Sequence, residues 1–169
     1  VKNSYVDNSN EIRIVKSYDI MKETVMKLKD KVEVSYYLVG RVRTTEQFNG
    51  MPFVVSINSI NPSLKEKIIN FRIKDYDNFE LSYTLNGTEF KKNGKIGEAL
   101  VDIDFNLTVN REGNFNRNAA KELSKLDYQI IVHDLDGLVH TFQNALQVVN
   151  PDYTNVLVLT FEDILPSRA

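Results

Sequence analysis

The chain of 169 residues contains no cysteine. Disulfide bonds, thiolate catalysis and zinc sites built on sulfur are therefore excluded for this chain. The absence fits either side of a membrane, because a domain of this size can bury a sufficient core without disulfides. An excess of one charge is also missing, since the formal net charge is −2 and the pI is about 5.8. Such a balance lacks the electrostatic footprint of a nucleic-acid-binding protein.

Long apolar runs are absent as well. No stretch approaches the roughly 18 residues expected of a transmembrane helix, and no signal-peptide pattern opens the chain. The first residue is Val1 rather than methionine. We therefore expect any targeting or anchoring segment to lie outside these residues. The content of 42% hydrophobic and 26% charged residues is typical of a globular protein.

Familiar catalytic motifs are missing. The chain has no Gly-x-Ser-x-Gly elbow, and its carboxylates include no pair obviously arranged for acid–base work on a sugar. Gly94-Lys95 resembles the end of a phosphate loop, but the upstream glycine is replaced by Glu89 and Lys95 is followed by Ile96. The pattern therefore predicts no phosphate site.

Three acidic or amide residues at alternate positions, Asp102, Asp104 and Asn106, match the opening of a calcium loop. That loop also requires a glycine at its sixth position and a glutamate at its twelfth. These positions hold Leu107 and Gly113. We therefore interpret the alternation as the solvated face of a strand.

Two histidines flank the start of an expected helix. His133 and His140 would suit a metal site if Asp134 or Asp136 joined them. The interpretation we favour is that one of these aspartates is the N-cap of the helix and that both histidines are exposed.

Arg41 and Arg43 stand close to Glu46 in the sequence. The two guanidinium groups could contact an anionic sugar or a phosphate. They could equally lie on a solvated strand end with Glu46 as a local partner, which we favour. No motif therefore identifies a catalytic residue, a cofactor-binding residue or a metal ligand, and we expect none.

Helical spacing occurs at the start of the chain and again near residue 120. The first helix is predicted from about Asp7 to Leu28, with Ser17 and Asp19 as residues that could divide it. Its apolar stripe consists of Ile14, Tyr18, Met21, Val25 and Leu28. A short helix is predicted from about Arg117 to Lys125, capped by Asn114 or Asn116.

Between these helices the apolar period changes to two, which is typical of strands with one buried face. The alternating segments are Val32–Leu38, Phe53–Ile57, Ile69–Ile73, Phe79–Leu85 and Val101–Val109. Asn86-Gly87 is the strongest hairpin signal, and it leads to a short strand near Phe90. Asn93-Gly94 is interpreted as a further turn.

The last quarter of the chain reads as strand, helix and strand. The strands are Tyr128–His133 and Asn155–Phe161, and a helical pattern extends to Val149 between them. We expect a parallel pair joined by a right-handed crossover, with the second strand in a central, covered position. Pro166 suits the first turn of a helix that continues beyond Ala169.

The predicted fold class is α+β, with a mixed sheet, helices packed mainly on one face and a C-terminal β-α-β unit. We find no linker and expect one domain over residues 1–169.

The order of four segments resembles the periplasmic domain of the polysaccharide chain-length determinant family, the polysaccharide copolymerases. The similarity is greatest to the large members of capsule and exopolysaccharide export, which are often fused to a cytoplasmic tyrosine autokinase. The segments are Asn10-Glu11-Ile12-Arg13-Ile14-Val15-Lys16-Ser17 continuing to Leu28; Val34-Ser35-Tyr36-Tyr37 with Gly40–Glu46 and Pro52-Phe53; Tyr128–Val149; and Val156–Asp163 continuing into Pro166-Ser167-Arg168-Ala169. The stretch from Asn58 to Asn118 lies outside the similarity.

The resemblance implies a membrane-proximal domain on the periplasmic face of the inner membrane, held there by transmembrane helices outside this chain. It implies a non-catalytic role in setting polysaccharide length and export. It also implies homo-oligomers and contact with the polymerase or export machinery, and with glycan as a further partner. No kinase motif is present here, so no kinase activity is assigned. The chain alone is expected to be a monomer or a weak oligomer.

Two other functions are compatible with the sequence. A glycan-binding or adhesin-like module of a surface protein would use Tyr36, Tyr37, Tyr83 and Arg41 to stack on sugars and bond them. A sugar-active enzyme ranks below both, because no catalytic pair is visible.

Overall fold

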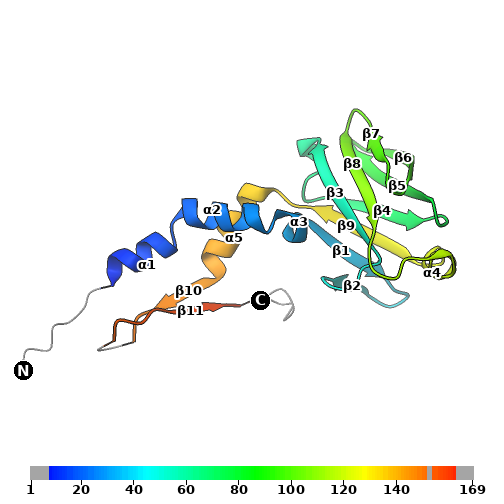
Figure 1. The fold of residues 1–169 in the computed structure, drawn as a ribbon. Helices are drawn as coiled ribbons and strands as arrows, with labels where there is room; N and C mark the ends of the chain where they lie inside the picture. Colours follow the sequence, from blue (N-terminus) through cyan, green and yellow to red (C-terminus); the bar gives the residue numbers. More distant parts are fainter. Residues whose placement is uncertain (1–7, 152–153, 163–169) are drawn as a thin grey trace, which may run out of the picture. The chain divides into compact units, whose positions relative to one another are not determined.

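The computed structural model describes residues 8–151 and 154–162. The part of the chain described is 27% helical and 42% strand, which confirms the predicted α+β class. The helices are α1 (Ser9–Val15), α2 (Tyr18–Lys27), α3 (Lys29–Val32), the 3-10 helix η1 (Pro62–Leu64), α4 (Arg117–Leu123) and α5 (Leu135–Ala145). The strands are β1 (Val34–Val39), β2 (Thr44–Gln47), β3 (Phe53–Ile60), β4 (Ile68–Ile73), β5 (Asn78–Leu85), β6 (Thr88–Lys95), β7 (Ala99–Val101), β8 (Phe105–Arg111), β9 (Asp127–Val132), β10 (Leu146–Val149) and β11 (Val158–Phe161) (Figure 1).

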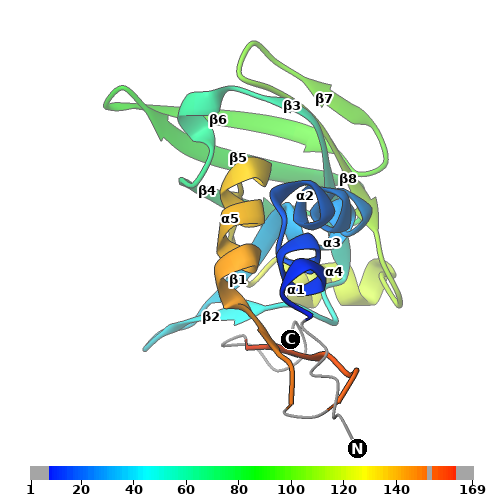
Figure 2. The same ribbon diagram turned by 90° about the vertical axis from the view of Figure 1, so that its left-hand side faces the viewer.

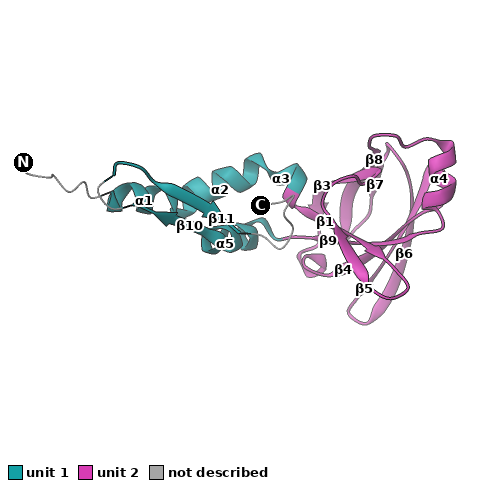
Figure 3. Cartoon of the chain, turned by 90° about the horizontal axis from the view of Figure 1, so that it is seen from below, with its two compact units in different colours: residues 1–31, 134–169 teal, residues 32–133 magenta. Residues whose placement is uncertain are grey.

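The chain divides into two compact units where one domain was expected (Figure 3). Unit 1 combines the two ends of the chain, residues 1–31 and 134–169, and unit 2 is the continuous stretch Val32–His133. No helix in the described ranges is both long enough and apolar enough to cross a membrane. The helical start expected at Pro166 lies outside the described residues.

Unit 1 is built on two neighbouring helices, α2 and α5, which lie side by side (Figure 2). The predicted division of the first helix is confirmed, because the hydroxyl of Ser17 accepts the N–H of Ile20 and caps α2. Met21 and Val25 are buried on α2, and Val139 is buried on α5. Ile14, at the outer end of the expected apolar stripe, is 61% exposed. Only the middle of the stripe therefore reaches the core.

The strand pairing expected at the C-terminal end is wrong. β11 pairs antiparallel with β10, and β9 belongs to a different sheet, so no parallel crossover joins β9 to β11. The helical pattern ends at Ala145, and Leu146–Val149 continues as a strand. β11 is not covered either, since Leu159 is 54% exposed. Its two apolar faces reflect β propensity rather than a central place in a sheet.

Unit 2 contains a six-stranded sheet and a three-stranded sheet, here called sheet A and sheet B. Sheet A has the order β2-β1-β9-β4-β5-β6, and sheet B has the order β3-β8-β7, with antiparallel neighbours throughout. Side chains of both sheets form one hydrophobic core, to which α4 contributes Ala120. Phe53 lies at its centre, stacked on Phe71 at 4.4 Å between ring centroids.

The period-two segments place their apolar residues in this core. Phe79, Leu81 and Tyr83 on β5 are almost completely buried, while the residues between them are only half-buried. Asn86 and Gly87 both have positive φ, at 51° and 81°, so the predicted tight hairpin between β5 and β6 is confirmed.

One turn assignment and one strand assignment are corrected by the structure. Asn93-Gly94 is not a turn, because β6 continues to Lys95 and Gly94 lies opposite Phe79. The Val101–Val109 segment is not one strand, because it breaks between β7 and β8 around Ile103, which is 96% exposed. Gly94 marks a close approach of backbone and ring rather than a chain reversal.

Candidate functional site

The outer face of sheet A carries a row of polar side chains from separate strands. The row is defined by direct cross-strand partners and consists of Glu46, Tyr37, Gln129, Asn70, Ser82 and Lys91. Side chains alternate between the two faces of a strand, so these residues lie opposite the buried core positions. Within the row, Gln129 Nε2 donates a hydrogen bond to Asn70 Oδ1 at 3.2 Å.

A cavity with a volume of about 330 Å³ lies on this face of unit 2. Its walls come from five strands and consist of Val39, Asn70, Phe71, Arg72, Glu80, Ser82, Lys91, Asp127, Tyr128 and Gln129. The rings of Phe71 and Tyr128 pack on Phe53 in the core. The remaining lining is therefore dominated by amides, a hydroxyl and charged groups. We call this cavity the sheet A groove.

The charges of the groove are paired with one another or with neighbours. Arg72 Nε donates to Asp127 Oδ1 at 2.7 Å. Glu80 lies 3.4 Å from Lys74 Nζ. Lys91 Nζ lies 4.0 Å from the Oε1 atom of a neighbouring glutamate on the same strand. The groove therefore presents hydrogen-bonding groups without an excess of either charge.

A second polar cluster joins β1, the end of β9 and the segment after η1. The Oγ of Ser35 lies 2.8 Å from His133 Nε2, and His133 Nδ1 lies 2.8 Å from Glu66 Oε2. Glu66 has a positive φ of 58°, and its N–H donates to the carbonyl of Val132 at 2.8 Å. The order serine, histidine and carboxylate is that of a nucleophilic triad.

The surroundings of Ser35 do not suit a nucleophile. Ser35 lies within β1 and is only 9% exposed, whereas a nucleophilic serine is presented on a sharp exposed turn. Its hydroxyl also donates to Glu46 Oε1 at 3.3 Å, so a second carboxylate competes for the same proton. We interpret the cluster as a structural tie between the strands of sheet A.

The residues of the rejected calcium motif form a third polar cluster. Asp104 is 8% exposed and is not on a solvated face, which corrects the expectation for this segment. Its carboxylate accepts the hydroxyl of Tyr83 at 2.8 Å and the amide of Asn61 at 3.0 Å. Asp102 accepts Lys92 Nζ at 2.6 Å. A turn forms here because the Asp102 N–H bonds the carbonyl of Phe105 and closes the chain between β7 and β8.

The pair of Asp102 with Lys92 predicts a specific pH dependence. The hydrogen bond from Lys92 is the main cause that lowers the pKa of Asp102 below its ordinary 3.8. A depressed folded pKa stabilises the fold above the unfolded pKa, and this contribution is lost as the pH falls through the folded value. Urea unfolding at pH 7, 5, 3 and 2 is therefore expected to show Asp102→Asn less stable than the parent at pH 5 to 7. The difference should vanish toward pH 2, and a constant difference at every pH would contradict this account.

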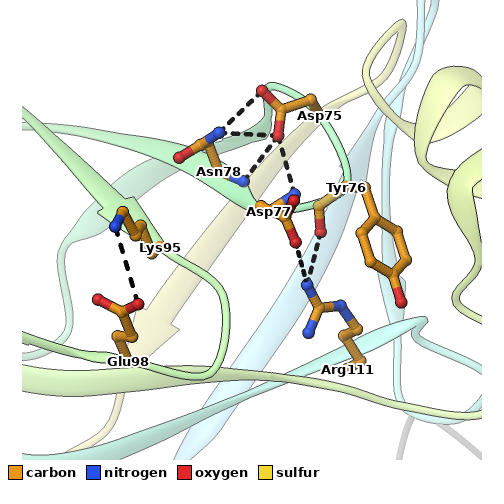
Figure 4. Close-up of polar contacts among 7 residues, drawn as sticks. All are labelled: Asp75, Tyr76, Asp77, Asn78, Lys95, Glu98 and Arg111. Atoms are coloured by element: carbon orange, nitrogen blue, oxygen red, sulfur yellow. Dashed lines mark hydrogen bonds and ion pairs between the residues drawn. The ribbon is translucent and has the colours of Figure 1, made fainter.

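Arg111 ties sheet B to the β4–β5 turn of sheet A (Figure 4). Its guanidinium donates to Asp77 Oδ1 at 2.8 Å and to the carbonyl of Tyr76 at 2.9 Å, and it lies 4.3 Å from the centroid of the Tyr76 ring. In the same turn Asp75 accepts bonds from Asn78, which lower the pKa of Asp75 below its ordinary value. Every group in this cluster holds the turn closed, which is a structural role.

The acidic residues near the histidines serve α5. Asp134 caps α5 by accepting the N–H of Gly137 at 3.1 Å, as predicted. Asp136 accepts the hydroxyl of Tyr18 at 2.8 Å. His140 is exposed as expected, but the prediction for His133 is wrong, because its side chain is only 19% exposed. Within the described ranges, no group of three or more His, Cys, Asp or Glu residues is placed to hold a metal ion.

The residues of the sugar-stacking alternative are not brought together. Tyr83 is buried in the core, and Tyr36 is largely buried, with its hydroxyl accepting the N–H of Val55 at 2.9 Å. Burial raises the pKa of Tyr36 to about 12. Tyr37 instead lies on the outer face of sheet A, and Arg41 is exposed in the turn after β1. Tyr36 and Tyr83 are therefore unavailable for stacking on a sugar.

No protein-family model matches the chain, and no curated protein matches it significantly.

Proposed function

We propose that the chain is a non-catalytic periplasmic domain of an inner-membrane polysaccharide copolymerase. The observation that carries this proposal is the order of the four similar segments along the chain. The fold is consistent with that order, since α1 with α2, α5 with β10, and β11 all contribute to unit 1. The dissimilar stretch 58–118 falls wholly within unit 2. The second similar segment and residues 128–133 of the third also belong to unit 2, where they precede and follow the divergent stretch in the sequence.

In this proposal the domain works through contacts and not through turnover. The full protein would be held in the inner membrane by segments outside residues 1–169 and would self-associate there. Its partners would be further copies of itself and the machinery that polymerises and exports capsular or exopolysaccharide. The extent of polymer growth would depend on that assembly.

The absence of nucleophilic catalysis can be tested at Ser35. An alkyl fluorophosphonate reacts with serines activated by a neighbouring histidine. Because Ser35 is enclosed in β1 and shares its proton with Glu46, we expect no adduct at Ser35 in intact-mass and peptide spectra. A serine hydrolase labelled in the same tube is the positive control. Adduct formation on the parent that is lost in Ser35→Ala would contradict a structural role.

The membrane placement is tested by topology mapping of the protein that contains this chain. Alkaline phosphatase fused within the exposed turn at residues 40–43 is expected to be active, because that enzyme folds only outside the cytoplasm. A β-galactosidase fusion at the same site should be inactive. The reverse pattern, or a protein without an apolar span on either side of this region, would overturn the proposal.

A glycan-binding module of a surface protein remains the second candidate, because the sheet A groove is polar and charge-balanced. The two candidates differ in where the full protein is held: in the inner membrane for the copolymerase, and at the cell surface for the glycan-binding module. Recovery of the full protein in the outer-surface fraction, without inner-membrane material, would favour the module.

A further inference from the structure

We infer that the sheet A groove binds a short, uncharged stretch of polysaccharide. The identity of the sugar source rests on the proposed function, whereas the groove itself is a property of unit 2. A cavity of about 330 Å³ falls within the size range of small-ligand sites. It differs from most such sites in that polar side chains dominate its lining. A polyhydroxylated ligand is the chemical class that fits such a lining.

The groove can exchange hydrogen bonds with hydroxyl groups in both directions. The bond from Gln129 to Asn70 uses one donor and one acceptor of the amide pair. The Asn70 amide nitrogen remains as a donor and the Gln129 carbonyl oxygen as an acceptor. Ser82, the cross-strand partner of Asn70, adds a hydroxyl that does both. A sugar hydroxyl is likewise a donor and an acceptor, so it can satisfy these groups in turn.

The charge balance decides which saccharide fits. Arg72 is held by Asp127, Glu80 is held by Lys74, and Lys91 Nζ has a glutamate oxygen 4.0 Å away, so each cation of the lining already has an anionic neighbour. An anionic sugar unit would have to displace one of these existing partners. A neutral hexose or N-acetylhexosamine unit requires no such exchange. The groove therefore selects uncharged residues of a polymer.

Three other ligand classes fit less well. A metal ion is disfavoured, since the lining contributes only Glu80 and Asp127 as carboxylates and both are paired with cations. A nucleic acid would require unpaired positive charge. A peptide added as a strand would need a free sheet edge, and the groove lies on a sheet face.

The test is an NMR titration of the 169-residue chain with defined oligosaccharides. The panel consists of neutral hexose oligomers, N-acetylhexosamine oligomers and uronic acid oligomers, each up to 10 mM. At least one neutral member is expected to give saturable shifts in the amides of Asn70, Ser82 and Gln129, with weaker effects from the uronic acid oligomers. The inference is overturned if no neutral member shifts these residues, or if the shifts map to another surface.

A double variant tests the contacts, with a matched control on the other sheet. Removing both amides in Asn70→Ala/Gln129→Ala is expected to weaken binding about tenfold, because the variant loses the hydrogen bonds that the two amides exchange with the sugar. Asn110→Ala changes an exposed asparagine on β8 of sheet B and should leave the affinity unchanged. Equal loss in both variants, or none in the double variant, would contradict the assignment.

The readout in cells separates this inference from the proposed function. If the groove binds polymer within a copolymerase, the Asn70→Ala/Gln129→Ala protein should shift the polymer length distribution toward that of the deletion. A distribution that changes on deletion but not in this variant would reject the groove and retain the proposed function. Saturable sugar binding, together with a polymer length distribution that is unchanged on deletion, would retain the groove and reject the proposed function.

Discussion

Asp104→Ala is expected to lower the free energy of unfolding of unit 2 by about 3 kcal/mol, because the buried hydroxyl of Tyr83 and the partly buried amide of Asn61 both lose their acceptor. The carboxylate is 8% exposed and accepts the hydroxyl of Tyr83, which is 2% exposed, and the amide of Asn61. Each orphaned group then carries its desolvation penalty. Urea denaturation followed by far-UV circular dichroism measures the loss. A loss below about 0.5 kcal/mol, as for a solvated aspartate, would contradict the burial of this cluster.

A double-mutant cycle isolates the tyrosine contact. Tyr83→Phe removes the buried hydroxyl, so Asp104→Ala in that background should cost less than in the parent. Asp104→Asn keeps an acceptor for Asn61 and should cost less than Asp104→Ala. Additive losses from Asp104→Ala and Tyr83→Phe would show that the two side chains do not interact.

Gly94→Ala is expected to destabilise unit 2 by about 2 kcal/mol, as extra volume does in a packed core. A Cβ built on Gly94 would lie 2.7 Å from Cε1 and 2.9 Å from Cε2 of Phe79. The ring is completely buried and stacked on Phe71, so it cannot turn aside without disturbing its neighbours. Thermal and urea unfolding of the variant would measure the effect.

Two comparisons make the Gly94 result specific. Gly137→Ala in α5 meets no atom closer than 3.8 Å and should be neutral or stabilising by up to about 1 kcal/mol, because alanine favours helix. Phe79→Leu should relieve part of the clash, so Gly94→Ala should cost less in that background. If Gly94→Ala is tolerated as well as Gly137→Ala, the close approach to Phe79 is wrong.

The strands of unit 2 were predictable because their apolar period directly encodes one buried face. Phe53, Phe71 and Phe79 occupy the core as the alternation requires. The N-caps at Ser17 and Asp134 were equally visible, since each satisfies backbone N–H groups within its own turn. Local sequence was sufficient wherever the deciding interaction was local.

Tertiary contacts decided the remaining cases. Asp104 continued an apparent alternation, but partners far along the chain hold it inside. Asn93-Gly94 is a dipeptide typical of turns, but Gly94 lies within β6, where the ring of Phe79 on the neighbouring strand packs against its backbone. The sequence predicted a parallel β9–β11 pair, but β11 pairs antiparallel with β10. The prediction failed because the apolar period of a strand does not specify which strand it pairs with.

The candidate sites depend on register and could not be read from spacing. Asn70, Ser82 and Gln129 are separated by up to 59 positions, yet cross-strand pairing sets them in one row. The sequence held a partial signal, namely polar residues at alternate positions in several strands. The contact of Ser35 with His133 likewise depends on the pairing of β1 with β9, and no sequence motif predicts it.

The length distribution of the surface polysaccharide tests the central proposal most directly. Cells expressing the full protein would be compared with cells expressing the same protein without residues 1–169, with extracted polymer resolved by gel electrophoresis and size-exclusion chromatography. We predict that the deletion changes the distribution of chain lengths while polymer is still made. An identical distribution in the two strains, with both proteins present at equal levels in the membrane, would contradict a role for this domain in chain-length control.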